Sequence, residues 1–145
     1  MKDPMSETVK QMDLDRLFKN FEVLQNWEDR YRFIIEMGKK IPPLDPSEKT
    51  EENRVHGCIS TVHMVINVTA DDPPRIHFIA NSDAMIVNGL IAIMQIIYDG
   101  QTAAEIAAVD LDAIFRKLGL VGHLSPNRRN GFFAIAERLR SLSGQ

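Results

Sequence analysis

Cys58 is the residue of this 145-residue chain best suited to covalent chemistry, because it is the sole cysteine. Gly57 precedes it, and glycine permits backbone angles and close approaches that other residues do not, which suits a displayed thiol. One thiol cannot form an internal disulfide, a CxxC redox pair or a four-thiolate metal site. The alternative is that Cys58 is structural, since isolated cysteines commonly serve as small buried apolar residues.

The histidines could suggest a metal site or a hydrolase, and a separate argument opposes each. His63 and His77 fall on the polar side of a predicted hairpin, four residues apart along the ladder, about 13 Å at about 3.3 Å per residue. One metal ion needs its ligands much closer, so we expect no metal. His56 lies two residues before Cys58, and that pair alone is an incomplete metal site. A hydrolase combining Cys58 with His56 or His123 would lack an orienting acid and an oxyanion loop.

The elements that must position Cys58 begin with two predicted strands. Apolar residues alternate with polar ones over residues 61–69 and 75–81, and residues 70–74 contain the Asp-Asp-Pro-Pro sequence of a turn. This pattern predicts an antiparallel hairpin with one buried face, on which Val62, Met64, Ile66 and Val68 lie. Residues 53–57 are a candidate short edge strand.

Apolar residues recur at helical spacing in the sequence both before and after this hairpin. Two helices are predicted before it, the first beginning after Asp13 and the second capped by Asn26 and ended by Gly38, and an exposed acidic connector covers residues 44–53. Four more are predicted after it. Their signals are Ser82 or Asp83 as an N-cap, Gly100 as a stop, a Thr102–Glu105 capping box, an apolar pattern over residues 111–118, and Ser125-Pro126. We therefore predict an α+β fold in which about six helices pack on one face of a hairpin or small sheet.

Composition excludes several classes of protein. Apolar residues make up 44% and charged residues 26%, and the net charge of −3 argues against a nucleic-acid partner. The polar start does not resemble a signal peptide, and the longest apolar stretch, residues 84–98, is shorter than the roughly 20 residues that span a membrane. We expect a cytoplasmic protein with a loose tail over residues 1–12 and a single domain over residues 13–145.

Several sequence blocks resemble one known family. The run Asn53-Arg-Val-His-Gly-Cys-Ile-Ser-Thr-Val62 resembles the N-x-V-x-G-C-x-S-x-V signature of the SufE family, which includes SufE and CsdE. Four further blocks resemble the family. They lie before and after this run in the same order as in the family, and the resemblance covers residues 14–141 in all. They are Asn26-Trp-Glu-Asp-Arg-Tyr31, Ile34-Ile-Glu-Met-Gly-Lys39, Ser82-Asp-Ala-Met-Ile-Val-Asn-Gly-Leu-Ile-Ala92 and His123-Leu-Ser-Pro-Asn-Arg-Arg-Asn-Gly131.

The resemblance implies a sulfur acceptor that stimulates a PLP-dependent cysteine desulfurase of the SufS or CsdA type. Cys58 would take sulfur from the desulfurase persulfide and deliver it to an iron–sulfur scaffold, with no cofactor of its own. The implied fold is similar to that of the scaffold protein IscU. The residues that would support Cys58 or contact the partner are Gly57, His56, Ser60, His63, Arg128 and His123.

Two positions depart from the family pattern and affect the expected partner contact. His63 stands where members usually carry an aromatic residue, and Ile59 replaces a commonly polar residue. Arg128 and Arg129 lie in the first turn of the last predicted helix, where cations are disfavoured, so they could face an anionic partner. Two other functions remain open: an interaction module with a structural Cys58, and a cluster scaffold, which the lack of further thiols opposes.

Overall fold

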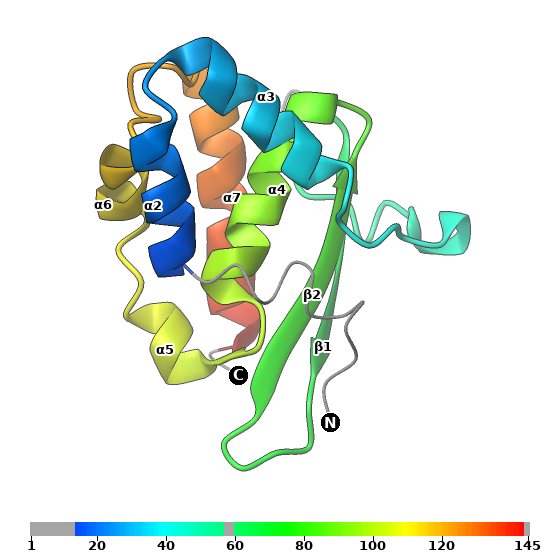
Figure 1. Cartoon of the computed structure of the whole chain (residues 1–145). Helices are drawn as coiled ribbons and strands as arrows, with labels where there is room; N and C mark the ends of the chain where they lie inside the picture. Colours follow the sequence, from blue (N-terminus) through cyan, green and yellow to red (C-terminus); the bar gives the residue numbers. More distant parts are fainter. Residues whose placement is uncertain (1–13, 57–59, 144–145) are drawn as a thin grey trace.

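The computed structural model describes residues 14–56 and 60–143 (Figure 1). Over these residues the chain forms six α-helices, a short 3₁₀ helix and an antiparallel sheet, which confirms the predicted α+β class. The first predicted N-cap, Asp13, lies outside the described residues. The elements are α2 (Leu14–Val23), α3 (Trp27–Gly38), η1 (Pro46–Glu48), β1 (Val62–Val68), β2 (Arg75–Ser82), α4 (Met85–Tyr98), β3 (Gln101–Thr102), α5 (Ala103–Ala107), α6 (Leu111–Lys117) and α7 (Pro126–Ser143).

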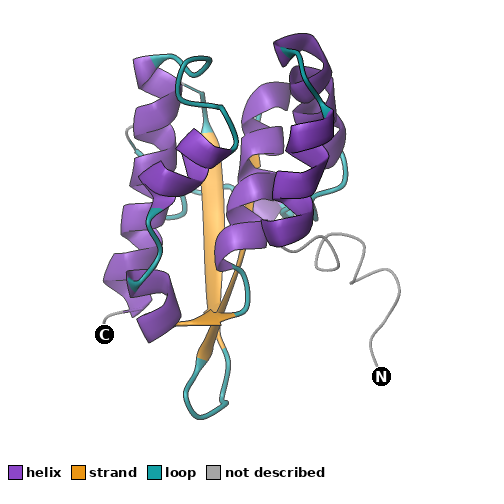
Figure 2. Ribbon diagram, turned by 60° about the vertical axis from the view of Figure 1, so that its left-hand side comes forward, coloured by secondary structure: helices purple, strands orange, loops and turns teal. Residues whose placement is uncertain are grey.

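The sheet has the strand order β1-β2-β3, and the helices cover one of its faces (Figure 2). The predicted register is confirmed: His63 pairs with Asn81, and Asn67 pairs with His77. Val68 was predicted to face the core but is 57% exposed. The reason is that the tip of the hairpin extends beyond the helical layer (Figure 1).

The third strand was not predicted from the sequence. Gln101 and Thr102 pair with Ile76 and Arg75, respectively, and so add a short strand at the far edge of β2. Two residues are too few to show an alternating pattern, which explains why no local signal indicated this strand.

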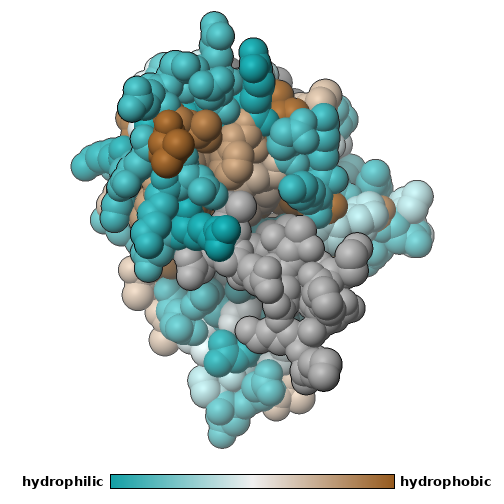
Figure 3. All heavy atoms as spheres, in the orientation of Figure 1, coloured by the Kyte–Doolittle hydropathy of each residue, from teal (hydrophilic) through white to brown (hydrophobic). Residues whose placement is uncertain are grey.

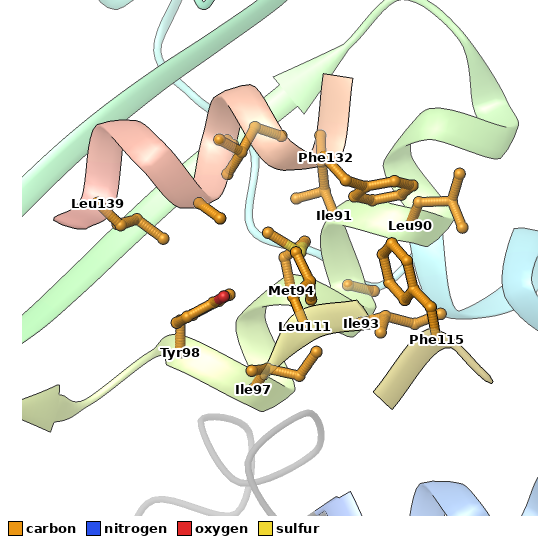
Figure 4. Close-up of a cluster of buried hydrophobic side chains, with 14 of the residues drawn as sticks. Leu90, Ile91, Ile93, Met94, Ile97, Tyr98, Leu111, Phe115, Phe132 and Leu139 are labelled. Atoms are coloured by element: carbon orange, nitrogen blue, oxygen red, sulfur yellow. The ribbon is translucent and has the colours of Figure 1, made fainter. Parts of the chain in front are cut away.

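Helix α4 is the centre of the core. Its buried side chains, among them Leu90, Ile91 and Met94, meet residues from α6 and α7 such as Phe115, Phe132 and Leu139 (Figure 4). This all-round burial explains why the helix is almost uniformly apolar. The visible outer face in Figure 3 is mainly polar, with separate apolar patches over the helical part. Within the described residues, no helix combines the length and apolar character needed to cross a membrane.

Helix ends follow the predicted signals with two exceptions. Asn26 accepts a hydrogen bond from the Asp29 amide at 2.9 Å, Thr102 and Glu105 form the capping box, and Gly100 has a φ of +78°. The N-cap of α4, however, is Ala84, without a side-chain cap. Ser82 and Asp83 do not fill that position because β2 continues through Ser82, whose backbone is held by Asn88.

Gly38 is the second exception. It is the last residue of α3, as predicted, but it does not adopt the left-handed backbone that a glycine stop signal suggests. A Cβ at Gly38 would lie 2.8 Å from the carbonyl carbon of Asn88 and 2.9 Å from the Cα of Gly89. Gly38 is therefore needed for the close approach of α3 to α4.

Candidate functional site

The candidate site is the loop that carries the sole cysteine. Gly57, Cys58 and Ile59 lie outside the described residues, but both flanks of this segment are described. The Val55 amide donates to the Val62 carbonyl at 2.9 Å, and both side chains are buried. Residues 56–61, here called the cysteine loop, therefore connect two residues that are held side by side.

The residues that lead into the loop pair with β1 at one position. The Met64 amide donates to the Asn53 carbonyl at 2.8 Å, and Arg54 forms an isolated β-bridge with His63. Residues 52–55, here called the stem, thus pair with β1 through this one bridge. Of the edge strand predicted over residues 53–57, the described residues show only the bridge at Arg54, because Glu52 and Asn53 lie in a turn. The stem also contacts η1, because Asn53 Nδ2 donates a hydrogen bond to the Glu48 carbonyl at 2.7 Å.

Arg138 of α7 contacts the same stem. Its Nη1 donates to the Arg54 carbonyl at 2.9 Å, and its Nη2 donates to the Glu52 carbonyl at 2.6 Å. Sequence reasoning missed this residue. Arg138 is one of several charged residues on an amphipathic helix, and no local signal indicates a contact with a segment more than 80 residues away.

The far end of the loop enters β1 and lies beside the residues that precede α4. The Asp83 amide donates to the Thr61 carbonyl at 3.4 Å, and Val62 pairs with Ser82. Met85, the first residue of α4, is 59% exposed. The end of the cysteine loop is therefore hydrogen-bonded to the segment that precedes α4.

The predicted supporting residues around the loop differ in their surroundings. His56 Nε2 lies 3.2 Å from Glu51 Oε1, but both side chains are largely exposed, so this ion pair contributes little stability. Ser60 is half-buried. His63 is also half-buried and, because Val62 and Met64 face the core, it lies on the sheet face away from the helices. There it is next to Asn81, which anchors Pro42 and Leu44 to β2.

Metal-binding side chains are dispersed in the part of the chain that the structure describes. There, no three His, Cys, Asp or Glu side chains come close enough to hold a metal ion. His63 and His77 remain four residues apart along the ladder, as the register predicts, and His77 instead contacts Asp99 at 3.2 Å.

His123 contacts a different part of the fold. Its ring stacks on Trp27 with a centroid distance of 4.2 Å and an interplanar angle of 6°. An open hollow lined by Trp27, Glu28, Tyr31 and Arg32 lies beside this stack. The structure thus joins the first and last sequence blocks of the family to each other.

Arg128 and Arg129 lie in the first turn of α7, which begins at Pro126. The side chain of Arg128 lies outside the described residues, so its expected contact with a partner stays a prediction. Arg129 Nη2 donates to Asp112 Oδ1 at 2.7 Å, and its guanidinium lies over the Phe133 ring. An ion pair with α6 therefore accounts for Arg129 in this first turn.

These features define an α+β protein in which a loop with one thiol is closed between two paired strand segments. The chain belongs to the SufE family, since the model of the Fe-S metabolism associated domain matches residues 15–143. An uncharacterized SufE-like protein of Rhizobium etli is 44% identical over 138 residues, which cover 94% of this chain and 93% of that protein. A second, from Rhizobium meliloti, is 43% identical over 129 residues, covering 88% and 92%.

A solved structure supports the fold. The solution structure of a hypothetical protein from Thermus thermophilus has a TM-score of 0.72 and 21% sequence identity, covering 92% of this chain and 94% of that one. At this identity the likeness concerns the fold alone. Membership of the family associates the chain with iron–sulfur metabolism.

Proposed function

We propose that this protein is a sulfur acceptor that takes persulfide sulfur from a PLP-dependent cysteine desulfurase onto Cys58. It stimulates the desulfurase by removing that sulfur, and it delivers the sulfur to an iron–sulfur scaffold. The observation that carries the proposal is the sole cysteine in a loop whose two flanks are paired by the Val55–Val62 hydrogen bond. Family membership supports the metabolic setting.

The chemistry needs one thiol and no cofactor on this chain. The Cys58 thiolate attacks the outer sulfur of the donor persulfide, and the sulfur–sulfur bond of the donor breaks. A new sulfur–sulfur bond forms at Cys58, and the donor cysteine leaves as a thiolate. The step conserves electrons, so it needs neither an oxidant nor a reductant. A second cysteine nearby could convert the persulfide into a disulfide, whereas this chain has none.

The remaining expected residues belong to this proposal as contacts of the loop or partner. Glycine at position 57 permits the close approach of another molecule, and His56, Ser60 and His63 are neighbours of Cys58 in the sequence, on the loop or on β1. Arg128 and His123 contribute to a surface for the desulfurase. A cytoplasmic location is part of the same proposal, because a free thiol carrier requires a reducing compartment.

Mass spectrometry after mixing with a desulfurase and free cysteine tests the proposal. We expect the peptide containing Cys58 to gain at least one sulfur atom, and we expect Cys58→Ser to abolish stimulation of the desulfurase without unfolding the protein. The matched control is the double variant Cys58→Ser with Ser141→Cys, which keeps one thiol but moves it to the exposed surface of α7.

We expect the wild type to accept sulfur much faster than the double variant. If the double variant gains sulfur as fast as the wild type, any exposed thiol suffices and the cysteine loop is not a specific acceptor. If wild-type Cys58 stays inert to both alkylation and sulfur transfer, the interaction-module alternative is correct. Iron bound after anaerobic purification would instead favour a cluster scaffold.

A further inference from the structure

The stem has two edges, and they have different partners. Toward β1, the Asn53 carbonyl accepts from Met64 and the Val55 amide donates to Val62. Arg54 lies opposite His63 between these two hydrogen bonds, so its own carbonyl points away from β1 and in a larger sheet would accept a hydrogen bond from another strand. The Glu52 carbonyl belongs to the turn that precedes the bridge.

Arg138 provides the donors on that outer edge. Its two terminal nitrogens donate to the Arg54 and Glu52 carbonyls at 2.9 Å and 2.6 Å. A guanidinium suits two neighbouring acceptors because its donors form a rigid planar fork, and charged donors make stronger hydrogen bonds than neutral ones. The side chain thus satisfies two carbonyls of the stem that have no partner on β1.

The contact also connects the stem to the core. On α7, Ile135 lies three residues before Arg138 and Leu139 directly follows it, and both are buried in the core cluster. The stem is therefore fixed to β1 by backbone hydrogen bonds and to α7 by Arg138. Fixing the start of a loop in this way reduces the conformational freedom that is lost when the loop engages a partner.

We infer that Arg138 is a positioning residue for the cysteine loop. It holds the stem in one orientation against β1 and α7, so that Cys58 is presented to the sulfur donor from a fixed base. This inference rests on the proposed function only for the identity of the donor. The effect on the stem itself can be measured without any partner.

The experiment compares the wild type with Arg138→Lys and Arg138→Gln, neither of which can reproduce the charged two-pronged contact. The control is Arg116→Lys, which changes an exposed arginine of α6 whose partner is Asp112. Hydrogen exchange of the Val55 and Met64 amides reports the stem directly. Because the chain has one cysteine, iodoacetamide alkylation measured across pH reports Cys58 alone.

In both Arg138 variants we expect the Val55 and Met64 amides to exchange about tenfold faster, as befits the loss of charged hydrogen bonds. We expect the alkylation rate of Cys58 to change severalfold, and kcat for sulfur acceptance to fall more than the apparent affinity for the desulfurase. Arg116→Lys should match the wild type in all three measurements.

Two results would overturn the inference. One is exchange and alkylation within about twofold of the wild type in both Arg138 variants. The other is faster exchange throughout the protein, which would mean that Arg138 contributes only global stability. If exchange and alkylation change as expected but no variant, nor the wild type, ever accepts sulfur, the positioning role stands and the proposed function is wrong.

Discussion

Gly89→Ala tests the close crossing of α3 and α4 that supports the sheet and its loop. Gly89 lies on the buried side of α4 against Ile34 of α3. A Cβ at this position would lie 2.5 Å from Ile34 Cγ2 and 2.7 Å from the Ile34 carbonyl carbon. Carbon atoms in contact are normally about 3.5–4.0 Å apart, so the two helices must separate by roughly 1 Å.

The expected cost follows from two opposing effects. Overpacking a tight core costs about 1–3 kcal/mol, and the upper part of this range applies because one of the clashing atoms belongs to the backbone. Alanine recovers about 1 kcal/mol through its higher helix propensity. We therefore expect the free energy of unfolding to fall by about 2 kcal/mol, which for a chain of this size lowers Tm by roughly 4–8 °C.

Urea unfolding followed by circular dichroism measures this difference, with Gly122→Ala as the matched control. A Cβ at Gly122 would meet no atom within 4 Å, and its φ is not positive, so the control should stay within about 0.5 kcal/mol of the wild type. If Gly89→Ala is as stable as Gly122→Ala, the crossing of α3 and α4 can admit a Cβ without cost, and the argument from close packing is wrong.

Three further predictions concern buried or capping groups. Burial raises the pKa of Tyr98, whose hydroxyl has no hydrogen-bond partner in the described structure. The Tyr98→Phe variant should therefore be at least as stable as the wild type at pH 7. Its advantage in the free energy of unfolding should grow above pH 10.0, because the phenol then ionises in the unfolded wild-type chain. Hydrogen bonds from the Thr102 amide and hydroxyl lower the pKa of the Glu105 carboxyl. The Glu105→Gln variant should therefore be less stable than the wild type at pH 7. Urea titrations should show this difference disappearing as the pH falls from 4.5 through the lower pKa of Glu105 in the folded state. Asn81→Ala removes the hydrogen bonds that hold the segment around Leu44; a loss of about 1–3 kcal/mol is expected, and faster amide exchange at Leu44 should accompany it.

The sheet shows which parts of a fold local sequence patterns can predict. The Asp-Asp-Pro-Pro turn and the period of two were enough to predict the pairing of His63 with Asn81 and of Asn67 with His77. The exposure of Val68 could not be predicted, because the period indicates a face but not where the covering helices end. Burial at the hairpin tip depends on the length of distant helices.

The helix ends show the same division. The Asn26 cap and the Thr102–Glu105 box depend on residues three positions apart, so the sequence was sufficient to predict them. The cap expected at Ser82 or Asp83 was wrong because pairing with β1 keeps Ser82 in β2. Gly38 was assigned to a stop signal, whereas its main contact is with Gly89, 51 positions later in the chain.

In the described part of the chain, the sequence blocks of the family are held by different contacts, and this affects where a partner surface should be sought. His123 was expected to support Cys58 or to contact the partner, and its ring stacks on Trp27, while the stem of the cysteine loop is held by β1 and Arg138. Motifs in linear order indicate that residues belong to one family, but they do not indicate which of them touch. A variant of His123 that weakens partner binding would therefore act through the α3 surface beside Trp27, whereas a variant of Arg138 would act through the stem. Measuring both in one sulfur-transfer assay separates docking of the partner, which changes KM, from presentation of the thiol, which changes kcat.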